Sequence, residues 1–233
     1  MGNTVVTINF KFRYLLGLLL VLSPLAFGHN ISASNAQFVQ GIVGPAIAPF
    51  MYLGAKHMVT GIDHLLFIVG VIFFLHRTKD VLVYVTLFTL GHSLTLILGV
   101  LLDVQVSPSV IDAIIGFSIV YKAFENMDGF RSVIPIRLNT KLAVFIFGLC
   151  HGLGLATKLT SFTLSDEGLL TNLVSFNIGV ELGQFSALAV MLVLLGTWRR
   201  LPSFERYAFS ANTILMIGGF LLMGYHLMDY AIA

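Results

Sequence analysis

Three histidines lie in the middle of long apolar stretches of this sequence, at depths where a bilayer tolerates few polar groups. They are His64, His92 and His151. Polar groups placed there are costly in hydrocarbon and usually mark a path for an ion or a substrate. Neutral imidazole is a good ligand for borderline divalent metals such as nickel, cobalt and zinc. Three such rings on three separate segments predict a shared metal site inside a membrane protein.

The stretch around His64 is the richest in polar groups. Asp63 directly precedes His64, so its carboxylate either binds the ion or orients a ring nitrogen of the histidine. His57 lies seven residues earlier, on the same face of a continuous helix, but about 10 Å of axial rise would separate the two side chains. Helix geometry therefore predicts that His57 and His64 cannot reach one ion unaided.

Carboxylates and amides on other segments add candidate ligands. Asn177, Glu181 and Gln184 follow helical spacing and form one polar stripe. Glu181 is expected to face the same cavity as the histidines, because it would otherwise be an unpaired buried charge. Glu125 ends another stripe, which begins at Ser118, and a carboxylate there would lower the electrostatic cost of a passing dication. A hydrogen-bond network that only holds helices together explains the amides and the Ser118 stripe equally well.

The composition identifies the solvent that surrounds these groups. Hydrophobic residues make up 57% of the chain and charged residues 10%, and the mean hydropathy is +0.94. A soluble domain of this size would be covered in apolar surface, so most of the chain must face lipid. The net charge of +2 is too small to indicate a nucleic-acid partner. Cys150 is the single cysteine, which excludes an intrachain disulfide framework and a site rich in thiolates.

Six apolar segments are long enough to cross a bilayer. We expect all of them to be helices, because a helix satisfies its own backbone groups in lipid. They cover residues 49–75, 81–102, 109–125, 138–157, 169–196 and 211–232. Nothing indicates a second domain. The sequence therefore predicts an all-α, polytopic membrane bundle in which residues 29–233 form a single six-helix transmembrane domain.

Residues 1–28 have the form of a secretory signal. Lys11 and Arg13 precede an apolar run of about 22 Å as a helix, which is short for a hydrocarbon core of about 30 Å. Small residues end the run and favour cleavage before His29, while a retained short helix is the alternative. Cleavage would leave His29 with a free α-amine beside its imidazole, a chelating pair for copper or nickel once the amine is deprotonated. An ordinary solvated histidine is the other interpretation.

Basic residues are distributed unevenly among the connections between these segments. The basic connections alternate along the chain and contain Arg77, Lys79, Arg131, Arg137, Lys141, Arg199, Arg200 and Arg206. The other connections, 103–107 and 158–168, contain a single lysine. Basic loops stay in the cytoplasm. The sequence therefore predicts a multi-pass protein of the inner (plasma) membrane, with its mature N-terminus and its C-terminus outside.

Taken together, these motifs closely resemble the HupE/UreJ family of membrane proteins. The resemblance runs from Gly54 to Gln184 in matching order, although Gly91, Cys150 and Leu155 depart from the residues usual in the family. It rests on His57, Asp63-His64, Gly91-His92-Ser93, Glu125-Asn126, His151-Gly152 and Asn177-x-Gly179-Val180-Glu181. Members are associated with hydrogenase and urease systems and regarded as nickel or cobalt permeases. The resemblance therefore implies metal uptake.

Two functional classes follow from this reading. In a permease, a divalent ion is taken from outside by His29 or His57, held by Asp63 and the three central histidines, and passed inward past Glu181 or Glu125. In a membrane metalloenzyme or metal-bearing accessory subunit, the same ligands hold a fixed ion. Transport is favoured over catalysis, with nickel first, cobalt next, and zinc or copper as further candidates. The expected partners are the metal ion and the lipid bilayer, not nucleic acid, and association of copies is left open.

Overall fold

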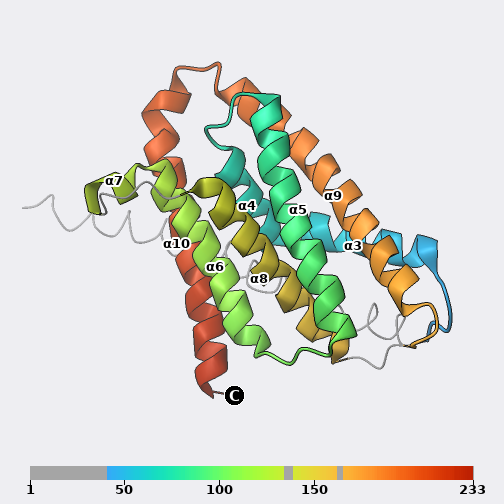
Figure 1. The fold of residues 1–233 in the computed structure, drawn as a ribbon. Coiled ribbons are helices and arrows are strands. Elements are labelled where there is room, and N and C mark those ends of the chain that lie inside the picture. Colours follow the sequence, from blue (N-terminus) through green and yellow to red (C-terminus); the bar gives the residue numbers. More distant parts are fainter. Residues whose placement is uncertain (1–40, 134–138, 162–164, 233) are drawn as a thin grey trace, which may run out of the picture.

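The structure is a computed structural model that describes residues 41–133, 139–161 and 165–232. Every regular element in these ranges is a helix, as the composition predicts (Figure 1). The helices are α3 (Ile47–Thr60), α4 (Ile62–Ile72), α5 (Thr78–Leu101), α6 (Pro108–Asn126), α7 (Gly129–Val133), α8 (Thr140–Thr160), α9 (Leu169–Trp198) and α10 (Ser203–Ile232). The predicted signal segment, residues 1–28, and His29 lie outside the described residues.

Four helices are long and apolar enough to cross a membrane, namely α5, α8, α9 and α10. The bent pair of α3 and α4 meets the same test if it counts as one span. α6 has 19 residues and includes Asp112, Lys122 and Glu125, which lower its apolar character, although it packs along α8 and α10. Large apolar side chains are exposed along α9, as expected of a surface that faces lipid. They include Leu170, Val174, Ile178, Leu182, Phe185, Val190, Val193 and Leu194.

The first predicted span is not one helix. α3 and α4 meet at Gly61 with a bend of 64°, so the expectation of a single helix over residues 49–75 is wrong at this point. Gly61 has an extended backbone, and its N–H donates to the His57 carbonyl at 2.9 Å. A Cβ atom at residue 61 would lie 2.8 Å from the Nδ1 atom of His64. The break therefore needs a glycine, because a side chain there would compete with the His64 ring for space.

Glycines set the distance between α3 and α9. A Cβ atom at Gly54 would lie 2.0 Å from the Phe176 carbonyl oxygen, and one at Gly179 would lie 1.9 Å from the Met51 carbonyl oxygen. Small residues let membrane helices approach this closely. α3 is therefore held against α9 by close contact between their backbones.

Hydrogen bonds at one end of the bundle join the ends of α4 and α9. Arg199, just after α9, donates from Nε to the Phe73 carbonyl at 3.2 Å and from Nη1 to the Leu75 carbonyl at 3.0 Å. Burial lowers the pKa of the Arg199 guanidinium from its ordinary value. That ordinary value is so high that the group nevertheless keeps its charge. Thr140 of α8 donates to Glu125 of α6 at the same end. We call this the basic end, because the connections that carry Arg77, Lys79, Arg199 and Arg200 lie there.

The other helix ends lie at the opposite end of the bundle. Asn172 of α9 accepts from the Ala46 backbone N–H at 2.7 Å, just before α3. Ser109 of α6 donates to Asp229 of α10 at 2.5 Å, and Figure 1 shows the last turns of α10 beside the start of α6. With α3 and α4 taken together, consecutive long helices therefore run in alternating directions between the two ends.

Candidate metal centre

The bend at Gly61 brings His57 and His64 together. Their ring centroids lie 5.0 Å apart, with an angle of 78° between the ring planes. In a continuous helix about 10 Å of axial rise would separate the two residues. The prediction that these two side chains cannot reach one ion is therefore wrong, because the chain turns between them and the axial rise no longer applies.

α5 and α8 bring two further histidines to His64. The centroid of His92 lies 6.2 Å from that of His64, and the centroid of His151 lies 5.0 Å from it. All three side chains are 0% exposed. A Cβ atom at Gly152 would lie 2.0 Å from the His92 carbonyl oxygen, so this glycine lets α5 and α8 pack closely enough to place both rings. The distances agree with the prediction that the three rings converge, while metal binding itself stays a prediction.

The potential ligand atoms form two sets, and His64 belongs to both. One set is His57, His64 and His92, and the other is Asp63, His64 and His151; within each, the ligand atoms lie within 4.8 Å of one another. Bonds of about 2.1 Å at tetrahedral angles place ligand atoms about 3.4 Å apart. Ligand atoms in either set would have to approach one another by at most about 1.4 Å around an ion, which is within the reach of side-chain rotation.

Hydrogen bonds determine which ring nitrogens are available as ligands. His151 Nδ1 lies 2.7 Å from the Phe147 carbonyl oxygen, which only accepts, so Nδ1 carries the hydrogen and Nε2 of the neutral ring carries the lone pair. His64 Nδ1 lies 3.2 Å from Asp63 Oδ1, and a carboxylate orients a ligating imidazole in the same way. Both rings therefore present Nε2 as the ligand atom, with Asp63 positioning His64 in this conformation.

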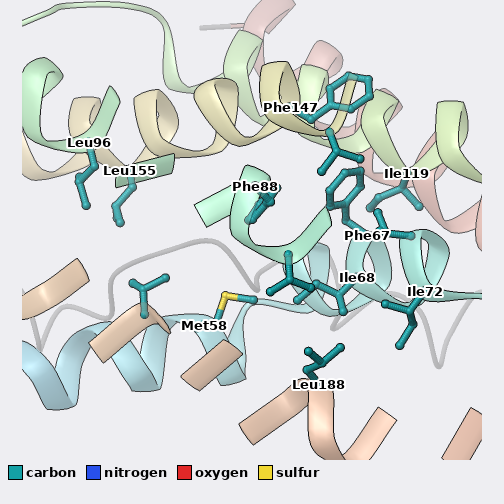
Figure 2. Packing of buried hydrophobic residues seen from close by; sticks show 14 of the residues in the cluster. Met58, Phe67, Ile68, Ile72, Phe88, Leu96, Ile119, Phe147, Leu155 and Leu188 are labelled. Carbon is teal, nitrogen blue, oxygen red and sulfur yellow. The ribbon is translucent and has the colours of Figure 1, made fainter. Parts of the chain in front are cut away.

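Two phenylalanines close the site on one side. The Phe88 ring lies 4.8 Å from the His151 ring, and the Phe67 ring lies 5.6 Å from it. The two phenyl rings lie 5.3 Å apart and are almost fully buried, and Figure 2 shows both inside the cluster of buried apolar side chains. Sequence reasoning did not assign them to the site. The available signal was their spacing, since Phe67 is three residues after His64 and Phe88 four before His92, which places each on the helix face of its histidine.

A comparison with family models gives this arrangement a context. The model described as HupE / UreJ protein matches residues 33–233. The chain belongs to the HupE/UreJ family. The match covers all the described residues and therefore every histidine of the candidate site. The family is implicated in nickel or cobalt uptake, or in an accessory role. Comparison with curated proteins and with solved structures found no match.

Two carboxylates predicted for the site lie elsewhere in this HupE/UreJ protein. Glu181 is exposed on α9, so the prediction that it faces the same cavity as the histidines is wrong. Glu125 lies at the basic end of α6, where it accepts from Lys122 at 2.6 Å and from Thr140. Neither carboxylate belongs to the two ligand sets around His64.

The two amides of the α9 stripe are buried. Asn177 is 8% exposed and donates from Nδ2 to the Leu173 carbonyl at 2.9 Å. Its Oδ1 atom has no hydrogen-bond partner among the described residues, so this oxygen is available to a ligand. Gln184 is 1% exposed and accepts from Thr89 of α5 at 2.7 Å. Gln184 therefore joins α9 to α5, as the packing interpretation of this stripe predicts.

Proposed function

We propose that this HupE/UreJ protein is a permease that takes up a divalent transition metal ion, nickel first and cobalt next. The observation that carries the proposal is the broken helix, because it places His57, Asp63 and His64 beside two buried histidines from other helices. Discontinuous helices commonly form the ion sites of membrane transporters. Imidazole with carboxylate, and without thiolate, suits borderline divalent metals.

The overlap of the two ligand sets favours transport over permanent binding. Because both sets contain His64, an ion held by His57, His64 and His92 lies directly beside the second set, Asp63, His64 and His151. His57 is partly exposed, whereas His64, His92 and His151 are fully buried. We therefore infer that the ion first binds the set that contains His57. A resident metal would need only one complete set of ligands.

We also infer that the bent pair and α6 cross the membrane, which makes six crossings with the four long apolar helices. The alternating helix directions support this arrangement, and the basic end would face the cytoplasm of a plasma membrane. The C-terminus and the start of α3 would then lie outside. Inward movement of a dication is worth roughly 4 to 5 kcal/mol per 100 mV of membrane potential. The sequence has no nucleotide-binding loop of the Gly-x4-Gly-Lys-Ser/Thr type, so the potential, a gradient or a partner would drive uptake.

The decisive experiment is radioactive nickel uptake into proteoliposomes with an inside-negative potential. The wild-type chain should accumulate nickel, and unlabelled cobalt should compete better than zinc or copper. His64→Ala should abolish uptake, whereas His76→Ala, at an exposed position after α4, should not. Tight stoichiometric binding without any flux would contradict the permease and indicate an accessory subunit or a metalloenzyme.

A further inference from the structure

A small cavity lies beyond the Phe67 and Phe88 rings, toward the basic end. It measures about 10 Å³, close to the smallest volume that holds one water molecule. Its lining is mostly apolar and consists of Phe67, Ile68, Val71, Tyr84, Val85, Phe88, Val144 and Gln184. The two phenyl rings therefore separate the histidines from a space whose lining is almost wholly apolar and to which Tyr84 and Gln184 contribute.

Tyr84 connects this cavity to a polar cluster built from α5, α6 and α8. Its hydroxyl lies beside the Thr140 hydroxyl and in the electrostatic field of Glu125. Thr140 donates to one oxygen of the Glu125 carboxylate, and Lys122 donates to the other at 2.6 Å. The cluster thus gathers the hydroxyl groups of Tyr84 and Thr140 and the ammonium group of Lys122 around the Glu125 carboxylate.

The Lys122–Glu125 ion pair is costly to keep where it lies. The side chain of Lys122 is 10% exposed and that of Glu125 is 20% exposed, so both charges lose most of their hydration. Such pairs often contribute no net stability compared with apolar residues of similar size. A role in cation binding accounts for keeping a carboxylate at this depth, and the lysine keeps that carboxylate neutralised.

We propose that Tyr84, Thr140 and Glu125 form a second cation site near the basic end, and that Lys122 occupies it until a divalent metal ion displaces its ammonium group. The proposal rests on the proposed permease, because the ion would arrive from the histidines past Phe67 and Phe88. Carboxylate and hydroxyl oxygens are harder ligands than imidazole. The same borderline ion would therefore bind more weakly here, which suits release toward the cytoplasm.

The test is calorimetric nickel binding to the full chain in nanodiscs. Lys122→Gln removes the resident ammonium and should add a second bound ion, with an affinity at least about tenfold above any second event of the wild type. Lys122→Arg keeps the charge and should behave as the wild type. The double variant Lys122→Gln, Glu125→Gln should lose the added ion. A folded Lys122→Gln protein without an added ion would overturn the proposal.

A control comes from an exposed ion pair. Arg131 Nη1 lies 3.4 Å from Asp128 Oδ1. Arg131→Gln should not add a bound ion, and an equal gain there would overturn the proposal, because any uncovered carboxylate would then attract nickel. If Lys122→Gln does not fold, Glu125→Gln at saturating nickel decides the matter. It should lose a weak second ion that the wild type binds, and no loss would overturn the site.

The two proposals can fail separately. His64→Ala removes the central site, so the ion added by Lys122→Gln should persist in a His64→Ala background. If that ion persists and the wild-type chain takes up no nickel, the second site is retained and the permease is rejected. Uptake by the wild type without any added ion would retain the permease and reject the second site.

Discussion

His64 is the residue on which metal binding should depend most, because it alone belongs to both ligand sets. His64→Ala should weaken nickel affinity by about 100-fold or more, whereas His57→Ala removes a ligand from one set only and should cost about tenfold. Calorimetry on purified protein in nanodiscs measures both. His76→Ala should match the wild type, and equal losses in His57→Ala and His64→Ala would contradict a shared ligand.

Glu181 provides a second test at the level of single residues. Its side chain is exposed on α9, whereas Asn177 and Gln184 of the same stripe are buried. Glu181→Gln should therefore change the equilibrium affinity for nickel by less than about twofold, since Glu181 belongs to neither of the two ligand sets around His64. Asp63→Asn should lower the affinity by about 10- to 100-fold. A loss in Glu181→Gln as large as that in Asp63→Asn would show that Glu181 reaches the site in another conformation.

At the scale of elements, the contact between α3 and α9 decides where the broken helix lies. Gly179→Ala would place a Cβ atom 1.9 Å from the Met51 carbonyl oxygen. Backbone has no room to yield there, so the two helices must separate, and the change should lower the free energy of unfolding by about 1 to 3 kcal/mol or more. The shift of the thermal unfolding midpoint measures this effect.

Gly196→Ala is the control for the same helix. A Cβ atom there meets nothing within 4 Å, and alanine is the better helix former by about 1 kcal/mol. This variant should therefore unfold at the wild-type temperature or slightly above it. Equal destabilisation by both substitutions would show that α9 is sensitive to any added methyl group and not to its contact with α3.

At the scale of the whole molecule, the alternating helix directions give a topology that can be tested. In a Cys150→Ser background, single cysteines at Arg77 and Arg200 should be labelled from the cytoplasmic side, and a cysteine at Ser107 from the outside. The physical reason is that the basic connections remain in the cytoplasm. Labelling of positions 77 and 107 from the same side by an impermeant maleimide would contradict the proposed crossings.

Several properties could be predicted from the sequence because they do not depend on which elements are neighbours. Composition alone indicates a membrane protein, since lipid is the only solvent that suits such an apolar chain. Apolar length places an unbroken helix such as α9, which the sequence predicts over 169–196 and which covers Leu169–Trp198. The depth of His64, His92 and His151 along their segments also predicts that the three rings lie at one level. Each of these inferences needs only distance along the chain.

Only the tertiary structure decided which side chains meet. The sequence contains Gly61, but a glycine in a membrane helix is compatible with a straight helix, and only the structure shows that the backbone is extended at Gly61. That break brings the His57 ring within 5.0 Å of the His64 ring, although about 10 Å of axial rise would separate the two residues in a continuous helix. Glu181 shares a stripe with two buried amides and is nevertheless exposed. The sequence could not predict this exposure, because a helix that is apolar on all sides gives no periodic signal for its packed face.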